Sequence, residues 1–368
     1  MRRTLLLFLS VCLLPITTKA GIETTDRITI SELTVAPGGD VASFEVSLQG
    51  SDVLYSAYEV TLQLPEGLTV DYTTTGTSKP RVFMSKPSLY PYTEEDDSYT
   101  HALFCSYGFV GERMLKVMCY SSANEDFTAT SGSLFRVYVK ASPFMKPGEA
   151  KITSENVYFT TKDEVEYDVA SEEFPLTVTG QSTVQLNVAA ENQWNTCVLP
   201  FDATPPSGLK AYESEEISGE YLILSEASSF RAYTPYIICA ENGFSGQLSG
   251  TVDADNYVSV ATDGYLHGAI TQQQITQGYV LQNLGEGPIF YNVNGQNFVI
   301  PQGKCWLAAG DASSSQAVRI GIDGASGIDS APSPAPADNA IYTLDGRRVK
   351  HPQAGHIYII GGKKAIKR

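Results

Sequence analysis

Tyr58-Glu-Val-Thr-Leu-Gln-Leu64 is the stretch that decides the fold class. Its side chains alternate with a period of two: the apolar residues share one face, and Glu59, Thr61 and Gln63 share the other. Such alternation predicts a β-strand with one face buried in a core and the other turned outward. Pro65-Glu-Gly67 supplies turn residues that end the strand.

The same alternation recurs from residue 21 to residue 180. Short runs rich in Val, Ile, Thr, Tyr and Phe are separated by Gly, Pro, Asn and Asp. No sustained apolar period of about 3.6 residues, the mark of an amphipathic helix, occurs after residue 20. The pattern predicts roughly eight or nine strands, enough for two packed sheets. We therefore expect residues 21–180 to form one β-sandwich.

Residues 103–120 predict a hairpin that turns at Gly111-Glu-Arg113. With Glu112 at its centre, three pairs of residues oppose each other on one apolar face: Phe109 and Leu115, Tyr107 and Val117, and Cys105 and Cys119. Cys105 and Cys119 are a candidate disulfide on this register. The pattern leaves open whether the two thiols are bonded or free.

Residues 183–322 predict a second all-β domain, also of sandwich or jelly-roll type. Alternation begins at residues 184–188. Asn294-Gly295 separates two aromatic-rich strands and predicts a two-residue hairpin turn. Trp194 and Trp306 each lie in an apolar run, so we expect both in the core of this domain.

A linker and a short tail follow the second domain. Residues 323–339 are rich in Pro, Ala and Ser, which favours an extended linker. Residues 340–368 predict a small β-unit with turns at Asp345-Gly346 and Gly361-Gly362, too short to bury a core alone. The predicted fold class is therefore all-β: two sandwich- or jelly-roll-like domains in tandem, plus a short C-terminal β-unit after a Pro-rich linker.

Residues 1–20 have the pattern of a secretory signal peptide. Arginines at positions 2 and 3 precede an apolar run from Leu5 to Ile16, and Thr18-Lys-Ala20 offers small residues for cleavage after Ala20. The run is too short for a membrane span of roughly 20 apolar residues. Lipidation at Cys12 is the alternative, because Leu-Ser-Val-Cys loosely resembles a lipobox. We expect a secreted protein, in the periplasm or at the cell surface, without membrane insertion after cleavage.

The charge of the chain argues against nucleic acid as a partner. The sequence has 25 Lys and Arg against 41 Asp and Glu, a net charge of −16. Removal of residues 1–20 takes away three basic residues and leaves 22 against 41, a net charge of −19. Binding to phosphates needs clustered positive charge. The basic residues cluster only in the tail, where residues 341–368 carry seven Lys and Arg against one acid.

No pattern of a catalytic or metal site is present. The four histidines have neither His-x-x-x-His nor His-Glu-x-x-His spacing, and the Gly-x-Ser-x-Gly and Walker motifs are missing. The five cysteines after residue 20 form no Cys-x-x-Cys pair, and their odd number leaves at least one thiol free or paired between molecules. The acidic clusters at 94–97 and 253–256 do not fit a calcium-loop spacing. We expect a protein that is not an enzyme and that has no metal and no cofactor.

Parts of the first domain resemble a cohesin-like domain. The resemblance rests on Ala36-Pro-Gly-Gly-Asp40, on residues 57–64 followed by Pro-Glu-Gly-Leu-Thr69, and on Ser131-Gly-Ser-Leu-Phe135. It covers most of residues 25–180, and it implies a fold related to the carbohydrate-binding modules of cellulolytic systems. Cohesins bind dockerins, which are calcium-loop modules that hold enzymes on a scaffold.

The other parts of the chain resemble segments of secreted Bacteroidota surface proteins. The second domain is similar to an all-β region of such proteins through residues 194–202, 234–238 and 278–282. The tail resembles, through residues 341–349 and 355–364, a shortened C-terminal sorting segment of type IX export. A structural remnant without sorting activity is the alternative for this tail.

Aromatic residues are the best candidates for ligand contacts. The polar loop 88–99 contains Tyr90, Tyr92 and Tyr99, whose rings, if exposed and roughly coplanar, would stack on sugar rings. Packing of this loop over the end of the sandwich is the alternative.

The first functional hypothesis is a secreted, non-catalytic carbohydrate-binding or adhesion module that binds a glycan or polysaccharide. The second is a scaffold module that binds a protein partner, and the third is an enzyme with an unrecognised site.

Overall fold

The computed structural model describes residues 21–85, 89–94, 97–108, 113–190, 193–258, 261–284, 287–308 and 316–322, and the short strands 341–342, 348–349, 357–360 and 363–366. Every regular element in these ranges is a strand, so the all-β prediction is confirmed. The predicted signal peptide (1–20) and the predicted linker (323–339) lie outside the described residues. No helix among the described residues is long and apolar enough to span a membrane.

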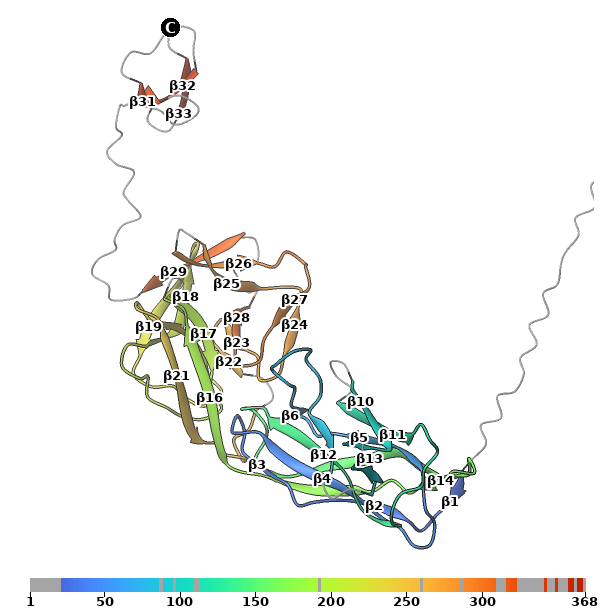
Figure 1. Ribbon diagram of the computed structural model, residues 1–368. Coiled ribbons are helices and arrows are strands. Elements are labelled where there is room, and N and C mark those ends of the chain that lie inside the picture. The colour runs from blue at the N-terminus through green and yellow to red at the C-terminus, as the bar shows by residue number, and fades with distance from the viewer. Residues whose placement is uncertain are drawn as a thin grey trace, which may run out of the picture.

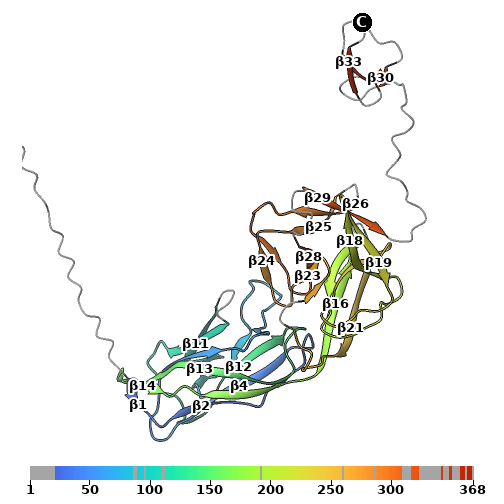
Figure 2. The same ribbon diagram turned by 180° about the vertical axis from the view of Figure 1, so that it is seen from behind.

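The first domain is a sandwich of two sheets (Figures 1 and 2). The larger sheet contains β1 (Ile22–Glu23), β3 (Thr34–Val35), β5 (Ala57–Gln63), β10 (His101–Tyr107), β11 (Met114–Ser121), β13 (Gly148–Thr160), β14 (Glu166–Val169) and β15 (Glu173–Val178). The smaller sheet contains β2 (Arg27–Ile30), β4 (Ala42–Gln49), β6 (Leu68–Val70), β7 (Val82–Met84) and β12 (Ser131–Ala141). β8 (Tyr92–Thr93) and β9 (Ser98–Tyr99) form a separate small hairpin.

The order of strands in the larger sheet is β1-β14-β13-β5-β11-β10, and that in the smaller sheet is β2-β4-β12-β6. The apolar faces of the two sheets pack together, with Phe44, Leu62, Phe135 and Phe159 among the fully buried side chains. The alternation predicted for residues 58–64 holds, because Val60 and Leu62 lie in this core while the polar residues between them face outward. Burial of apolar side chains contributes about 25 cal/mol per Å², which makes this core the main stabilising element of the domain.

The predicted register of the β10–β11 hairpin is wrong by two residues. Leu103, not Cys105, is the partner of Cys119, and Cys105 pairs with Val117. A slip of two residues keeps every side chain on its face, so the alternating pattern could not detect it. Both thiols therefore still face the core, and both are free cysteines in the structure. The predicted turn at 111–113 lies mostly outside the described residues.

The outer face of the smaller sheet carries an ion-pair cluster. The carboxylate of Asp71, with little exposure, lies 2.6 Å from the guanidinium of Arg81 and 3.0 Å from the ammonium of Lys140. Burial opposes ionisation of Asp71, but the hydrogen bonds and charges of these two cations outweigh it and hold its pKa below the ordinary value. Arg81 also lies 4.2 Å from the centre of the Tyr138 ring, which in turn makes an edge-on contact with the exposed ring of Phe83.

The second domain is built around one ten-stranded sheet with the order β17-β20-β18-β19-β29-β26-β25-β28-β23-β22. Its strands are β17 (Trp194–Val198), β18 (Lys210–Ser218), β19 (Tyr221–Ala227), β20 (Pro235–Cys239), β22 (Ala261–Asp263), β23 (Leu266–Gly268), β25 (Tyr279–Leu284), β26 (Gly287–Asn292), β28 (Cys305–Leu307) and β29 (Ala317–Ile322). A ribbon of β16 (Gln181–Val188) and β21 (Phe244–Thr251) and a pair formed by β24 (Gln273–Ile275) and β27 (Phe298–Ile300) complete the domain.

The ten-stranded sheet curls until the edge strand β17 lies beside β28. The backbone N–H of Cys305 donates a hydrogen bond to the Thr196 hydroxyl at 2.9 Å, and Val198 N–H donates to the Gly303 carbonyl at 3.0 Å. These bonds join strands that are distant in the sheet order. The domain therefore has one curled sheet with a ribbon against it, not two equal sheets as in a simple sandwich.

The hairpin predicted around Asn294-Gly295 does not form, although the turn does. Asn294 and Gly295 have φ values of 51° and 76°, the left-handed conformation that this dipeptide favours. However, β26 before the turn pairs with β25 and β29, whereas β27 after it pairs with β24. The turn residues fix a sharp reversal, but they do not determine which strands become partners.

The two domains meet through a loop of the first domain between β12 and β13. Phe144, on this loop, is buried in a core cluster of the second domain. Beside it, the Ser142 hydroxyl donates to the side-chain carbonyl of Gln302 at 2.8 Å. β16 continues from the first domain into the second (Figure 1). A Cβ atom at Gly38 would come within 1.8 Å of the Thr183 carbonyl oxygen, so this contact between the domains requires glycine.

The C-terminal segment contains a small sheet with the order β31-β30-β32-β33. Its strands are β30 (Ile341–Tyr342), β31 (Arg348–Val349), β32 (Ile357–Ile360) and β33 (Lys363–Ile366). They match the strands predicted for the tail.

Candidate functional site

The tyrosine loop does not form the predicted aromatic platform. Tyr90 is 2% exposed, and its hydroxyl lies 2.7 Å from that of Tyr58 and donates to the Leu134 carbonyl at 2.8 Å. Tyr92 is 48% exposed, and its hydroxyl bonds to the carboxylate of Asp97. The Tyr90 and Tyr92 rings meet Tyr99 at 81° and 64°, so the three rings are not coplanar.

The burial of Tyr90 has a clear physical cause. Its ring packs against the rings of His101 and Phe127, which lie beneath the loop in the first domain. Burial raises the pKa of the Tyr90 hydroxyl well above its ordinary value. The loop thus packs over part of the sandwich, and Tyr90 contributes to the core instead of a ligand surface.

The outer face of the larger sheet carries a second candidate site, which combines apolar and polar side chains. The strand register brings one residue from each of five strands into a single row across this face: Phe104, Met118, Glu59, Tyr158 and Asp168. Side chains directly opposite on neighbouring strands are close enough to interact. This row joins an apolar region on β10 and β11 to a polar region on β5, β13 and β14.

The apolar region is centred on two stacked aromatic rings. The rings of Phe104 and Tyr120 lie 5.2 Å apart with an angle of only 7° between their planes. They are 45% and 47% exposed, and Met118 beside them is also exposed. Large apolar groups that gather on an outer sheet face are unusual for a surface that meets only water. We therefore define Phe104, Met118 and Tyr120 as the aromatic patch.

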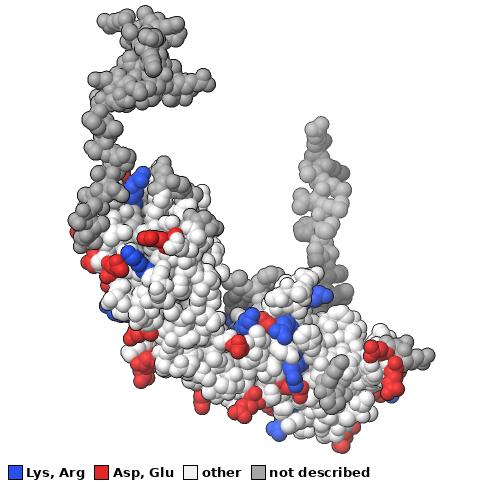
Figure 3. All heavy atoms as spheres, turned by 60° about the vertical axis from the view of Figure 1, so that its left-hand side comes forward, with Lys and Arg blue, Asp and Glu red and all other residues white. Residues whose placement is uncertain are grey.

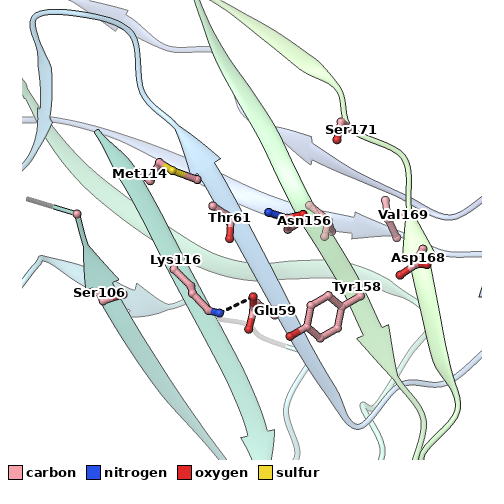
Figure 4. Close-up of a pocket in the computed structure, with 12 residues that line it drawn as sticks. Glu59, Thr61, Ser106, Met114, Lys116, Asn156, Tyr158, Asp168, Val169 and Ser171 are labelled. Carbon is pink, nitrogen blue, oxygen red and sulfur yellow. Dashed lines mark ion pairs between the residues drawn. The ribbon is translucent and has the colours of Figure 1, made fainter. Parts of the chain in front are cut away.

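The polar region lines a hollow of about 730 Å³ (Figure 4). The ammonium group of Lys116 lies 2.6 Å from a carboxylate oxygen of Glu59 at its floor. The Glu59 side chain is only 12% exposed, whereas that of Lys116 is 44% exposed, so the ion pair joins a nearly buried carboxylate to a more exposed lysine. Tyr158 points toward Glu59 from the next strand (Figure 4).

A β-bulge in β13 orients Tyr158. Glu155 pairs with Thr61 and Tyr158 pairs with Glu59, so two residues of β13 oppose the single residue Val60. Asn156, in the bulge, has a φ of 43°. With Glu155 outward, a regular strand would turn position 158 inward, but the extra residue reverses this parity. Burial and a hydrogen bond to Glu59 then raise the pKa of Tyr158, which keeps its hydroxyl protonated.

This arrangement is suited to binding. The outer sheet face offers an apolar anchor, an ion pair and hydrogen-bonding groups within one surface. Among the described residues, no group of three or more His, Cys, Asp or Glu side chains could hold a metal ion. Acidic and basic side chains both occur over the two domains on the face shown in Figure 3, with large neutral areas between them.

The residues of this face were not among those selected from the sequence. The alternation in residues 58–64 predicted that Glu59 faces outward, but not that Tyr158 and Lys116 surround it. The pairing of Phe104 with Met118 would have required the correct register of β10 and β11. The one sequence feature that could have indicated this site is the large apolar side chain of Phe104 on the outward face of an alternating strand.

Solved structures similar to this chain are cohesin modules. One is a non-cellulosomal cohesin from Archaeoglobus fulgidus, which is 17% identical to this chain in sequence. The matched region covers 42% of this chain and 91% of the cohesin chain, with a TM-score of 0.30. A type I cohesin from Pseudobacteroides cellulosolvens is 11% identical to this chain. The matched region covers 42% of this chain and 92% of that cohesin chain, with a TM-score of 0.32. A cohesin from R. flavefaciens in complex with a group 1 dockerin is 12% identical to this chain. The matched region covers 42% of this chain and 94% of that cohesin chain, with a TM-score of 0.29.

No family model matches the chain, and no curated protein matches it. At these identities and TM-scores the likeness to cohesins does not establish a function.

Proposed function

We propose that this protein is an exported, non-catalytic module that binds another protein through the outer face of its larger sheet. The observation that carries the proposal is the exposed stack of Phe104 on Tyr120, which shares its face with the Glu59–Lys116 ion pair. Aromatic side chains are the most frequent anchors of protein interfaces, where a few residues provide most of the binding energy. The aromatic patch is such an anchor, and the polar hollow beside it provides hydrogen bonds and orientation.

The charges of the face indicate the chemistry of the partner. Asp168 lies in the same row as Glu59 and Tyr158, and Glu155 lies in the neighbouring row. The whole chain has a net charge of −16. Complementary charge speeds the encounter of two proteins and fixes their relative orientation. The expected partner thus presents an apolar group flanked by Lys or Arg. Cohesins, which residues 25–180 resemble in sequence, bind dockerins, so a dockerin-like module is the first candidate to test.

Carbohydrate binding at the tyrosine loop is the weaker proposal, because the buried Tyr90 removes one of the three rings from the surface. Export is supported by the charged and apolar pattern of residues 1–20 and the small residues before position 21. A role as a scaffold rather than an enzyme is supported by the lack of catalytic spacing motifs in the sequence. Sorting by the basic tail remains part of this proposal.

The test compares two variants that each remove one exposed phenylalanine ring. Phe104→Ala removes the stacked ring of the aromatic patch, and Phe83→Ala removes a ring of 49% exposure from the opposite sheet. Wild-type protein and both variants are immobilised and exposed to the exported proteins of the source organism, and the retained proteins are quantified by mass spectrometry. Loss of a central anchor costs about 2 kcal/mol or more, which is roughly a thirtyfold loss of affinity.

We expect at least one protein to be retained by the wild type and by Phe83→Ala but lost from Phe104→Ala. Retention that is equal for the wild type and both variants would exclude this face as the binding surface. Circular dichroism of each variant provides the control for folding.

A further inference from the structure

The second domain contains a cavity of about 420 Å³ where β17 meets β25 and β28. This volume lies within the range of small-molecule sites in proteins, about 300–1,000 Å³. The wall of the cavity is about half apolar, and its apolar part includes Trp194, Val280, Phe298 and Ile300. Its polar part includes Lys304 and Asn283, together with Asn187, Asn195 and Thr196. Ligand sites combine apolar side chains with polar groups that fix the orientation of the ligand.

Lys304 brings a positive charge into this cavity without a carboxylate partner. Its ammonium group donates to the Asn195 side-chain oxygen at 3.0 Å and to the Thr196 carbonyl at 3.3 Å. Within the described part of the chain, no Asp or Glu oxygen lies within ion-pair distance of it. Burial lowers the pKa of Lys304. An ammonium group has three donors, and two neutral acceptors do not neutralise its charge, so an anion at this position would be strongly favoured.

Asn283 lines the same cavity. Its side-chain N–H donates to the Trp194 carbonyl at 3.0 Å. Its side-chain oxygen is buried and has no hydrogen-bond partner among the described residues. Buried polar atoms are nearly always hydrogen-bonded, and an exception requires an explanation. A donor on a ligand, such as a hydroxyl group, would satisfy this oxygen.

The two polar groups are held close together by β17. Asn283 is anchored on Trp194, and Lys304 is anchored on the next two residues of the same strand. Neighbouring residues of a strand are about 3.3 Å apart, so the two side chains are anchored at adjacent positions of β17. Turn residues from Pro301 to Gly303 lead directly into Lys304 and fix its position at the start of β28.

We propose that this cavity binds a hydroxylated carboxylate, with a uronic-acid sugar unit as its ligand class. The carboxylate of the ligand pairs with the Lys304 ammonium group, and a ring hydroxyl donates to the side-chain oxygen of Asn283. The apolar face of the sugar ring packs against the wall formed by Trp194 and Val280. This site lies in the second domain, so it does not depend on the partner face of the first domain.

Isothermal titration with three probes tests the site. The probes are glucuronate, glucose as its neutral counterpart, and an oligoglucuronate as a polymeric source of the same acid. We expect glucuronate to bind at least tenfold more tightly than glucose, which lacks the carboxylate. If the oligoglucuronate binds more tightly than glucuronate, the natural ligand is a polysaccharide, and if the order is reversed, it is a free sugar acid.

Two substitutions and one matched control separate the site from a general charge effect. Lys304→Met keeps an unbranched side chain that is one atom shorter and removes its charge, and Asn283→Asp places a negative charge beside the ligand. Both should reduce glucuronate binding at least tenfold, whereas Lys210→Met, which removes an exposed lysine of the same domain, should leave it unchanged. Equal binding of glucose and glucuronate, no binding of either acid, or unchanged binding by both site variants would overturn the proposal. Asn283→Asp retains a side chain of similar size, so it still tests the site if Lys304→Met does not fold.

Discussion

Phe144 provides a sharp test of how the two domains are joined. Phe144 lies on a loop of the first domain, but it is only 5% exposed. It belongs to a core cluster of the second domain, together with Val198 and Cys305. The core of the first domain does not include it. Phe144→Ala should therefore remove packing from the second domain while it leaves the first core intact.

The expected magnitude follows from the burial of this ring. Replacement of a fully buried phenylalanine by alanine costs about 3–5 kcal/mol, because contacts are lost and a cavity remains. For a domain of this size, 1 kcal/mol changes the melting temperature by about 3 °C, so the second-domain transition should fall by roughly 10 °C. Differential scanning calorimetry of the wild type and the variant measures this shift directly.

Phe83→Ala is the matched control, because its ring is exposed on the first domain. We expect it to change either transition by less than about 2 °C, as surface substitutions usually cost under 0.5 kcal/mol. The reasoning would be refuted if Phe144→Ala shifted the second-domain transition as little as the control. An equal fall of both transitions would instead show that the domains unfold as one unit.

Three further predictions concern the first domain and the buried thiols. The ion pairs of Asp71 with Arg81 and Lys140 lower the pKa of its carboxyl group. The stabilisation from these ion pairs is therefore present at neutral pH and is lost as the pH falls from about 4 through that lowered pKa. Asp71→Asn should lower the melting temperature by several degrees near pH 7, and the difference from the wild type should disappear in acid. Burial raises the pKa of the Cys119 and Cys197 thiols to about 12, so a thiol reagent at about pH 8 should label both only after unfolding, and labelling of the folded protein would contradict their burial. Tyr90→Ala should lower the free energy of unfolding in urea by about 3 kcal/mol, whereas Tyr92→Ala should change it by less than about 1 kcal/mol; similar effects of the two would mean that Tyr90 does not fill the core.

The alternation of side chains predicted the strands and their faces, because burial on one side imposes a period of two. It could not predict the register of β10 against β11, since a shift of two residues exposes no apolar group. The pairing of β27 with β24 was equally hidden, because Asn294-Gly295 specifies a local turn and long-range packing selects the partner strand. The tail was simpler to predict, since two of its three strand pairings join strands that follow one another in sequence.

The candidate site was harder to predict than the fold. Its row of side chains combines five strands, so each member depends on a correct register. The bulge at Asn156 that orients Tyr158 has no signal in a pattern of apolar and polar residues. Tyr90 failed as a predicted ligand residue for a related reason: a polar loop sequence does not reveal that one of its rings packs beneath it.

The most direct test of the partner face is a photo-crosslink in the organism that makes the protein. A benzophenone side chain is introduced at position 104, within the aromatic patch, and in a second strain at position 83 on the opposite sheet. The account predicts a discrete adduct with one protein on irradiation of the first strain and none in the second. Equal adducts from both positions, a diffuse polysaccharide adduct from position 104, or no adduct there would contradict a protein partner on this face.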